Sequence, residues 1–568
     1  MKAVFERRTR WNRGGRFAST TALVGAIVVS ATTLLLVRAL PATAQGAEAS
    51  KGSNAQRLLT PEEMALRVEK FISLRVEPLD LPVLGASRGA GGERYGDIRG
   101  DRIHGYLRKL VAFSQESKRN GDVLWGRLHG SVYERRATEY VRDQFASGGL
   151  EDVEIQPFTA VEPRWVPEEI ELRVLAGADG SPPAQRYTFR SAMTGFPSGV
   201  TPAQGITAPV EYVGMASPAE LRGRDLSGKI ALVYVRVWED VLFHTAHLAM
   251  ARLTKETGAA GAILWLDRPG NAQVAAQLWN PKNDEWFTDV PWVNIGFYDG
   301  VYLRKLIERT DPANPPKVTL TVTGEMVKDL KSQNLVAMVP GTTDENIIVT
   351  AHIDGFFNAA QDTGAGVAGL MELARHYSGL PRESRRRNLI FLVAGDHEHE
   401  GWSGVAQFAR RNPDLLAKTV AALQLEKALA PATGRDLNVR TLANTQAPTS
   451  LFVSNSNAIL VDAFTDAAQI YGIPMLRGFR KHYAGDVEGL YGSGIPAAGW
   501  IGVNYPYHSE EDSPALISES ALQDVTRAYA SVIDRINEHT REELYAGASE
   551  APGAIYDAED LQFLLGMW

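Results

Sequence analysis

The sequence predicts an α/β protein in which a mostly parallel (mixed) sheet is sandwiched by helices, together with a smaller β-rich domain. In residues 333–540, short apolar, β-branched runs alternate with longer amphipathic runs. That alternation is typical of a sheet covered by helices on both faces. In residues 160–325, short β-rich runs dominate, and they predict a smaller β-rich domain. A chain of 568 residues also exceeds one compact core, so two or three domains are expected.

Local patterns place the elements in order. Helices are predicted over 103–115, where apolar residues recur at helical spacing, and over 134–149, which a Gly pair ends. An alternating strand follows at 153–158. The β-rich region then adds a helix near 246–258 and strands at 169–175, 208–214, 229–236 and 262–266. The last region adds strands 334–340, 346–351, 388–394, 420–425 and 495–501, and helices 364–378, 403–410, 458–471 and 519–538.

The N-terminus has the layout of a secretory signal. Residues 1–16 are basic, residues 20–37 are apolar, and Ala42-Thr43-Ala44 offers small residues at a cleavage site. We expect a signal peptide over 1–44 and export to the periplasm or the extracellular space. An uncleaved anchor is the alternative, because an apolar run of about 18 residues can span a bilayer.

Composition excludes several kinds of site and partner. Cysteine is absent, which rules out disulfides, thiolate metal sites and a cysteine nucleophile. The net charge is −8, and residues 1–44 carry +6, so the remainder carries −14. An acidic body argues against nucleic acid as a partner. No later segment has the pattern of a membrane span.

Histidine or carboxylate residues follow four of the predicted strands. His352 and Asp354 follow the strand 346–351, and Glu426 follows the strand 420–425. The strand 388–394 is followed by 395-GDHEHEG-401, and the strand 495–501 is followed by 505-YPYHSEED-512. One such histidine is ordinarily a turn residue, but four coincident strand ends can converge nitrogen and oxygen donors on one crevice. The pattern therefore predicts a metal site, while HExxH and P-loop motifs are absent and no serine sits in a GxSxG elbow between a strand and a helix.

The stretch 346–375 resembles the metal core of the di-zinc aminopeptidase family, which includes secreted bacterial aminopeptidases and glutamate carboxypeptidase II. In that family a first histidine and a metal-bridging aspartate lie ten residues apart, before a helix that begins with small residues. His352 and Asp362 match this spacing. Asp354 matches the acid that orients the histidine.

Later segments extend the resemblance. Glu426 matches the metal ligand after the third strand, and His508 matches the closing metal ligand. Tyr507 is implied to steady the oxyanion. Asp486, in 485-GDVEGLYGSGIPAAGW-500, is implied to line the substrate pocket.

The segment 396-DHEHEG-401 departs from the family, which has adjacent glutamates before a glycine. Aligned on Gly401, Glu398 falls on the general base and His399 on the zinc ligand. Alternatively the loop is longer and Glu398 or Glu400 is the ligand, or His397 occupies the base position. A site that has lost metal binding is a further alternative.

Two other regions resemble parts of such peptidases. Residues 126–158 are similar to the N-terminal helix segment, and residues 226–236 and 258–270 to an inserted protease-associated domain. The implied division begins with a signal peptide (1–44), a flexible segment (45–100) and the N-terminal part of the peptidase domain (101–159). A region containing the protease-associated domain (160–330), the catalytic domain (331–545) and a tail (546–568) follow.

The resemblance implies a zinc exopeptidase, more specifically an aminopeptidase. Two zinc ions would share Asp362 and a water, Glu398 would act as base, and the substrate would be a peptide. A carboxypeptidase-type hydrolase and a catalytically silent binding protein are the alternatives. The C-terminal residues 551–568 could pack on their own chain or on a partner, so a homodimer is possible. No membrane contact beyond the N-terminal segment is expected.

Overall fold

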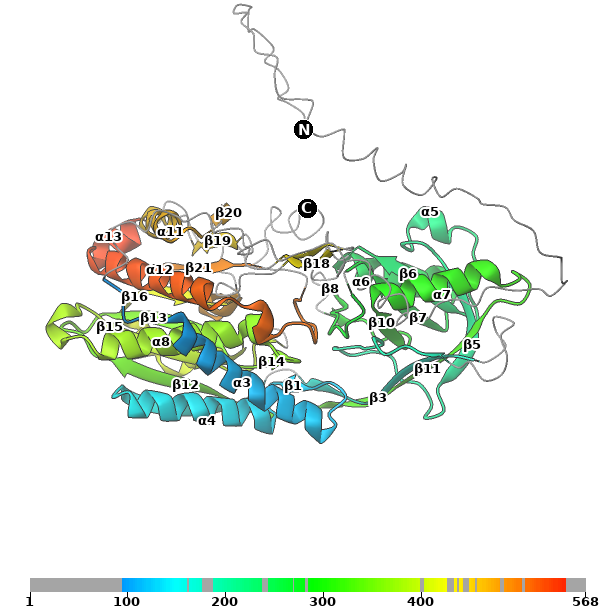
Figure 1. The fold of residues 1–568 in the computed structure, drawn as a ribbon, viewed down its shortest axis with the longest axis horizontal. Coiled ribbons are helices and arrows are strands. Elements are labelled where there is room, and N and C mark those ends of the chain that lie inside the picture. Colours follow the sequence, from blue (N-terminus) through cyan, green and yellow to red (C-terminus); the bar gives the residue numbers. More distant parts are fainter. Residues whose placement is uncertain are drawn as a thin grey trace, which may run out of the picture. The chain divides into compact units, whose positions relative to one another are not determined.

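A computed structural model gives the fold (Figure 1). It describes the residues that follow the N-terminal segment, with short gaps: 94–160, 163–175, 187–236, 244–268, 270–280, 285–398, 403–426, 434–436, 439–442, 449–454, 457–473, 475–480, 485–502 and 506–547. The predicted signal peptide therefore lies outside the described residues. Among the helices that the structure describes, none is both long and apolar enough to cross a membrane.

An eight-stranded mixed sheet has the order β2-β12-β15-β13-β16-β21-β19-β20. The pairs β15–β13, β13–β16 and β16–β21 are parallel. The strands span Glu151–Thr159 (β2), Lys331–Val339 (β12), Asn346–His352 (β13), Asn388–Ala394 (β15), Thr419–Gln424 (β16), Thr449–Val453 (β19), Met475–Arg480 (β20) and Ala497–Ile501 (β21).

Helices cover both faces of this sheet because its central strands are apolar on both sides. In β13, Ile347 and Val349 belong to one buried cluster, and Ile348 belongs to another. The first cluster includes residues of α3 (Gly100–Asn120), α4 (Val132–Ser147), α8 (Ala365–Ser378), α11 (Ala458–Tyr471) and α12 (Glu519–Asn537). The second includes residues of α9 (Ser403–Arg411) and of the helical turn Gly485–Leu490. Two short helices, α10 (Pro413–Ala417) and α13 (Arg541–Ala546), complete this part.

A second sheet has seven strands in the order β10-β7-β6-β5-β11-β3-β4. It lies within residues 164–327, which we call the insert. The strands span Arg164–Val174 (β3), Tyr187–Thr188 (β4), Ile206–Tyr212 (β5), Ile230–Val235 (β6), Gly261–Leu266 (β7), Trp292–Ile295 (β10) and Lys317–Val327 (β11).

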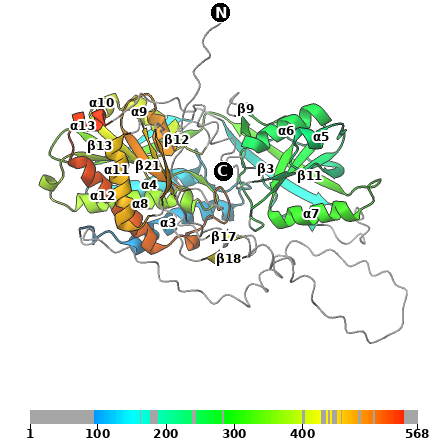
Figure 2. The ribbon, with the colours of Figure 1, turned by 90° about the horizontal axis from the view of Figure 1, so that it is seen from above.

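Helices also cover both faces of the seven-stranded sheet. Ala231 and Val233 pack with α6 (His244–Thr257), whereas Ile230 and Leu232 pack with α7 (Phe297–Arg309). Figure 2 shows α6 and the short α5 (Pro218–Leu221) on the side opposite α7. Each sheet therefore has its own core.

Two-stranded pairs complete the described structure: β1 (Gly126–Arg127) with β14 (Gly355–Phe356), β8 (Trp279–Asn280) with β9 (Glu285–Trp286), and β17 (Gly434–Asp436) with β18 (Val439–Leu442). The predicted α/β class and its mixed, helix-covered sheet are confirmed. The sequence patterns missed α7, β10, β11, β19 and β20. In β11, 317-KVTLTVTGEMV-327, threonines alternate with apolar residues, which is typical of a strand, but no strand is predicted there in the sequence analysis.

Arg127 fixes the chain between β13 and α8. Its guanidinium is fully buried and donates from Nε to the carbonyl oxygen of Ile353 at 2.9 Å and from Nη2 to that of Ala359 at 3.0 Å. Nη1 donates to Ser114 Oγ at 2.8 Å and to the carbonyl oxygen of Asn358 at 3.1 Å. One side chain therefore satisfies several backbone acceptors that have no access to water.

Arg127→Met should lower the free energy of unfolding by at least ~3 kcal/mol, because it leaves these buried acceptors without donors. Urea denaturation measures the change. Arg119→Met is the matched control, since Arg119 is exposed at the end of α3 and should change stability by less than ~0.5 kcal/mol. Equal stability of the two variants would contradict the role given to Arg127.

Candidate metal centre

His352 ends β13 and is fully buried. Its Nδ1 lies 3.0 Å from the carbonyl oxygen of Asp354, so this nitrogen is the donor. The opposite nitrogen, Nε2, lies 3.4 Å from Asp362 Oδ1. The contact at Nδ1 therefore fixes the ring so that Nε2 is available as a ligand atom.

The carboxylate of Asp354 organises the loop after β15. It lies 3.6 Å from His352 Nδ1 and accepts the backbone N–H groups of His397 and Glu398, each at 3.0 Å from Oδ2. One buried acid thus connects the residue after β13 to the residues after β15.

Asp362 lies where the chain turns into α8, with φ −113° and ψ 82°. Its backbone N–H donates to Asp512 Oδ2 at 3.2 Å, and that of Gln361 donates to both Asp512 oxygens at 2.8 and 3.0 Å. Asp512 therefore holds the turn that presents the Asp362 side chain.

His508 faces the same carboxylate from another loop. Its Nε2 lies 3.3 Å from Asp362 Oδ2 and 2.9 Å from Glu398 Oε2. The ring of Tyr507 stacks on His508 with centroids 3.7 Å apart, and Phe356 meets it edge-on at 5.0 Å. These two aromatic contacts leave the imidazole little freedom to turn.

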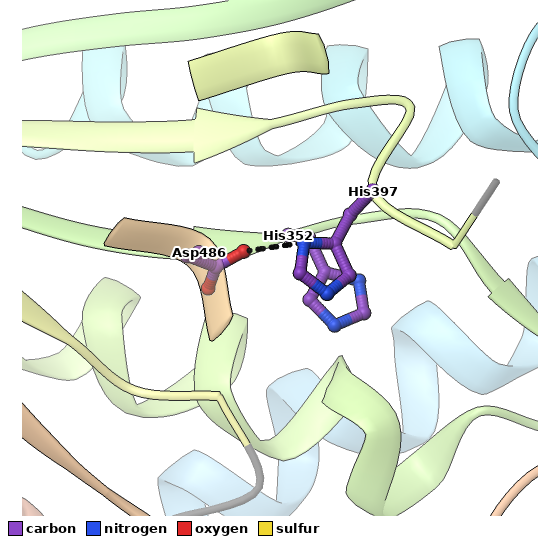
Figure 3. Close-up of side chains that lie close together, drawn as sticks. All are labelled: His352, His397 and Asp486. Atoms are coloured by element: carbon purple, nitrogen blue, oxygen red, sulfur yellow. Dashed lines mark ion pairs between the residues drawn. The ribbon is translucent and has the colours of Figure 1, made fainter. Parts of the chain in front are cut away.

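His397 and Asp486 lie beside His352 (Figure 3). The imidazoles of His352 and His397 stack with centroids 4.0 Å apart. His397 Nδ1 lies 3.3 Å from Asp486 Oδ1, and Nε2 lies 3.7 Å from Glu426 Oε1. Gly485 makes room here, because a Cβ on it would lie 1.7 Å from Glu426 Oε2.

The buried carboxylates control the protonation of the two histidines. Burial would lower the pKa of His352, but Asp354 and Asp362 outweigh it and raise this pKa well above its usual value. Burial would lower the pKa of His508 too, but Glu398 and Asp362 raise it to about 9. Both shifts favour the cationic form of the imidazoles when no metal is bound.

Two of the acids show the opposite effect of burial. Burial raises the pKa of Asp486 to about 6 and that of Asp512 to about 7. These shifts arise because several carboxylates share a small volume without water. A divalent cation would relieve that crowding by replacing protons.

The donor set fits a metal. Both oxygens of Asp486 and Oε1 of Glu398 are buried and accept no hydrogen bond from any residue that the structure describes. Two groups of three side chains have ligand atoms within 4.8 Å of one another: His352, His397 and Asp486, and His352, Asp362 and Glu398. Imidazole and carboxylate donors of this kind suit a borderline divalent cation.

The structure brings together the predicted residues that it describes: His352, Asp354, Asp362, Glu398, Glu426, Asp486, Tyr507 and His508. His399, predicted as a ligand, and Glu400 lie outside the described residues. The sequence analysis gave His397 only as an alternative base, whereas the structure shows that it contacts both Asp486 and Glu426. It gave no role to Asp512, which holds the Asp362 turn. The position of Asp512, four residues after His508, was the sequence signal that could have indicated this role.

Comparisons with known proteins show what the chain is similar to. Residues 334–533 match the model of peptidase family M28. Carboxypeptidase Q of Bos taurus is 24% identical over 297 residues, which cover 50% of this chain and 58% of that protein. The chain therefore spans less than two thirds of the length of this curated relative.

Solved structures share the fold. The zinc aminopeptidase BSAP from Bacillus subtilis matches with a TM-score of 0.54 at 19% identity, over 77% of this chain and 94% of that chain. A peptidase M28 precursor from Shewanella amazonensis matches with a TM-score of 0.53 at 20% identity, over 76% and 96%. At these identities the likeness shows the fold alone, and the predicted peptidase-like fold is confirmed.

Affinity for a divalent cation should rise at least ~tenfold per pH unit between pH 7 and 8, because the cation must displace the proton that His508 holds with a pKa of about 9 and also the proton of His352, whose pKa is raised too. Calorimetric titration with Co²⁺ in several buffers measures both the affinity and the released proton. An affinity that does not change with pH would show that His508 is not a ligand.

Proposed function

We propose that the protein is an exported, zinc-dependent exopeptidase that acts as an aminopeptidase, because residues 334–533 match the model of peptidase family M28. One observation carries the proposal: residues that follow β13, β15 and β16 and the loop 506–512 place imidazole and carboxylate groups in one buried cluster. A cluster of this kind is costly to bury without a cation.

Two zinc ions would be held by His352, Asp362, Glu426 and His508, with a further ligand from the loop after β15. Asp362 lies between the two histidines, at 3.4 Å from His352 Nε2 and 3.3 Å from His508 Nε2, and this position suits a carboxylate that both ions share. Zinc supplies activation of a water for attack on a peptide carbonyl.

Glu398 is proposed as the proton acceptor. Its Oε2 is fixed 2.9 Å from His508 Nε2, and its Oε1 accepts no hydrogen bond among the described residues, so Oε1 can take a proton and pass it to the leaving amine. The same place also suits a metal ligand, in which case His397 would be the base. Tyr507, stacked on His508, is proposed to stabilise the oxyanion.

A carboxypeptidase-type reaction is the second candidate, favoured by the similarity to carboxypeptidase Q of Bos taurus. Asp486 is completely buried beside His397, and we propose that it limits the depth of the substrate pocket.

The insert is proposed to be a protease-associated domain. The basic and apolar layout of residues 1–44 supports export.

Glu398→Gln should lower kcat about 10²–10⁴-fold, because the amide cannot accept the proton. Turnover of leucine p-nitroanilide and zinc content by elemental analysis are measured together. Retention of both zinc equivalents with lost turnover supports Glu398 as base, whereas loss of one equivalent makes Glu398 a ligand. Glu154→Gln is the matched control, since this carboxylate is exposed on β2, and it should leave both measurements unchanged.

Substrates blocked at one end should distinguish the two candidate activities. An aminopeptidase should cleave Leu-Gly-Phe and its C-terminal amide and leave N-acetyl-Leu-Gly-Phe intact, since a free amine is required at the cleaved end. Mass spectrometry of the products identifies the released residue. Release of phenylalanine from the acetylated peptide would make the protein a carboxypeptidase.

A further inference from the structure

We propose that the insert completes the metal centre, with Arg268 as a positioning residue that holds the loop carrying His508. The inference rests on the proposed zinc function, because the residue that Arg268 would position, His508, is a proposed zinc ligand. Arg268 lies just after β7, and its side chain is 3% exposed.

The guanidinium of Arg268 contacts the residues on either side of His508. Nη1 donates to the carbonyl oxygen of Tyr507 at 3.4 Å, and Nη2 donates to Ser509 Oγ at 3.2 Å. A planar fork of donors can hold two acceptors at a fixed separation, which a single amine cannot do. Arg268 therefore restrains the backbone immediately before and after the ligand.

Backbone pairing strengthens this contact. Val274 and Ser509 form an antiparallel bridge. The N–H of Ala275 donates to the carbonyl oxygen of His508 itself at 2.8 Å, and the N–H of Glu510 donates to the carbonyl oxygen of Gln273 at 3.1 Å. The segment 273–275 thus acts as a short strand partner of the ligand loop.

This partner segment is anchored in the core of the insert. Asn294, in β10, is fully buried, and its Nδ2 donates to the carbonyl oxygens of Val274 at 2.9 Å and Met193 at 2.8 Å. The position of the partner segment is therefore tied to the edge of the seven-stranded sheet. A shift of that sheet edge would be transmitted to residues 508–510.

The ligand loop needs such support because His508 has a positive φ of 52°. A non-glycine residue in the left-handed region costs about 1–2 kcal/mol and persists only where surrounding contacts hold it. Asn358 Nδ2 also donates to the carbonyl oxygen of Glu510 at 3.0 Å. The loop is thus held by the eight-stranded part on one side and by the insert on the other.

Loss of an outer contact that orients a metal ligand typically costs 10–100-fold in metal affinity. Arg268→Met should therefore weaken binding of one zinc equivalent about 10–100-fold in the full-length protein, measured by competition with a chelator. Arg268→Lys should be intermediate, because lysine can reach one acceptor but not both. Arg304→Met is the control, since Arg304 lies on α7 and pairs with Glu308.

The melting temperature of metal-free protein separates positioning from a general structural role. We expect Arg268→Met and Arg268→Lys to differ from each other in zinc affinity more than in melting temperature. The absorption spectrum of the Co²⁺-loaded variants should also change, because it reports ligand geometry. If Arg268→Lys fails to restore affinity, or Arg268→Met loses stability and keeps tight zinc binding, the inference is wrong and the proposed function stands. A wild-type protein without zinc would overturn both.

Discussion

The parallel pairing of β13 with β15 and β16 is the constraint on which the site depends. These strands run side by side in register, so that His352 pairs with Ala394 and Thr350 with Gln424. The residues that follow each strand therefore emerge at the same edge of the sheet. Because the strands are buried on both faces, their ends are rigid, and the histidines and acids just beyond them have fixed positions.

Burial of so many ionisable groups imposes a second requirement, which is charge balance. Asp362, Glu398, Glu426 and Asp486 are each at most 7% exposed, and isolated carboxylates in such surroundings are strongly destabilising. The raised pKa values of His352 and His508 show how protons provide part of the balance. A divalent cation provides it better, because it neutralises several acids at once and accepts the imidazole nitrogens as ligands.

The closing ligand belongs to a loop shared by the two parts of the chain. Asp512 connects that loop to the turn at Asp362, whereas Ala275 and Arg268 connect it to the insert. The insert contributes hydrogen bonds directly to the backbone of a proposed ligand, so its folding and the geometry of the site are coupled.

The sequence by itself determined many of the elements and indicated most of the candidate ligands, because apolar periodicity and the residues at strand ends are local properties. The spacing of His352 and Asp362 was readable for the same reason. Only the tertiary structure decided that His397 lies against Asp486 and Glu426, since the segment 396–401 admits more than one alignment and side-chain direction depends on the fold. The roles of Arg127 and Arg268 could not be predicted either, because most of their acceptors lie more than 200 residues away in the chain, and no local pattern encodes a contact at that separation.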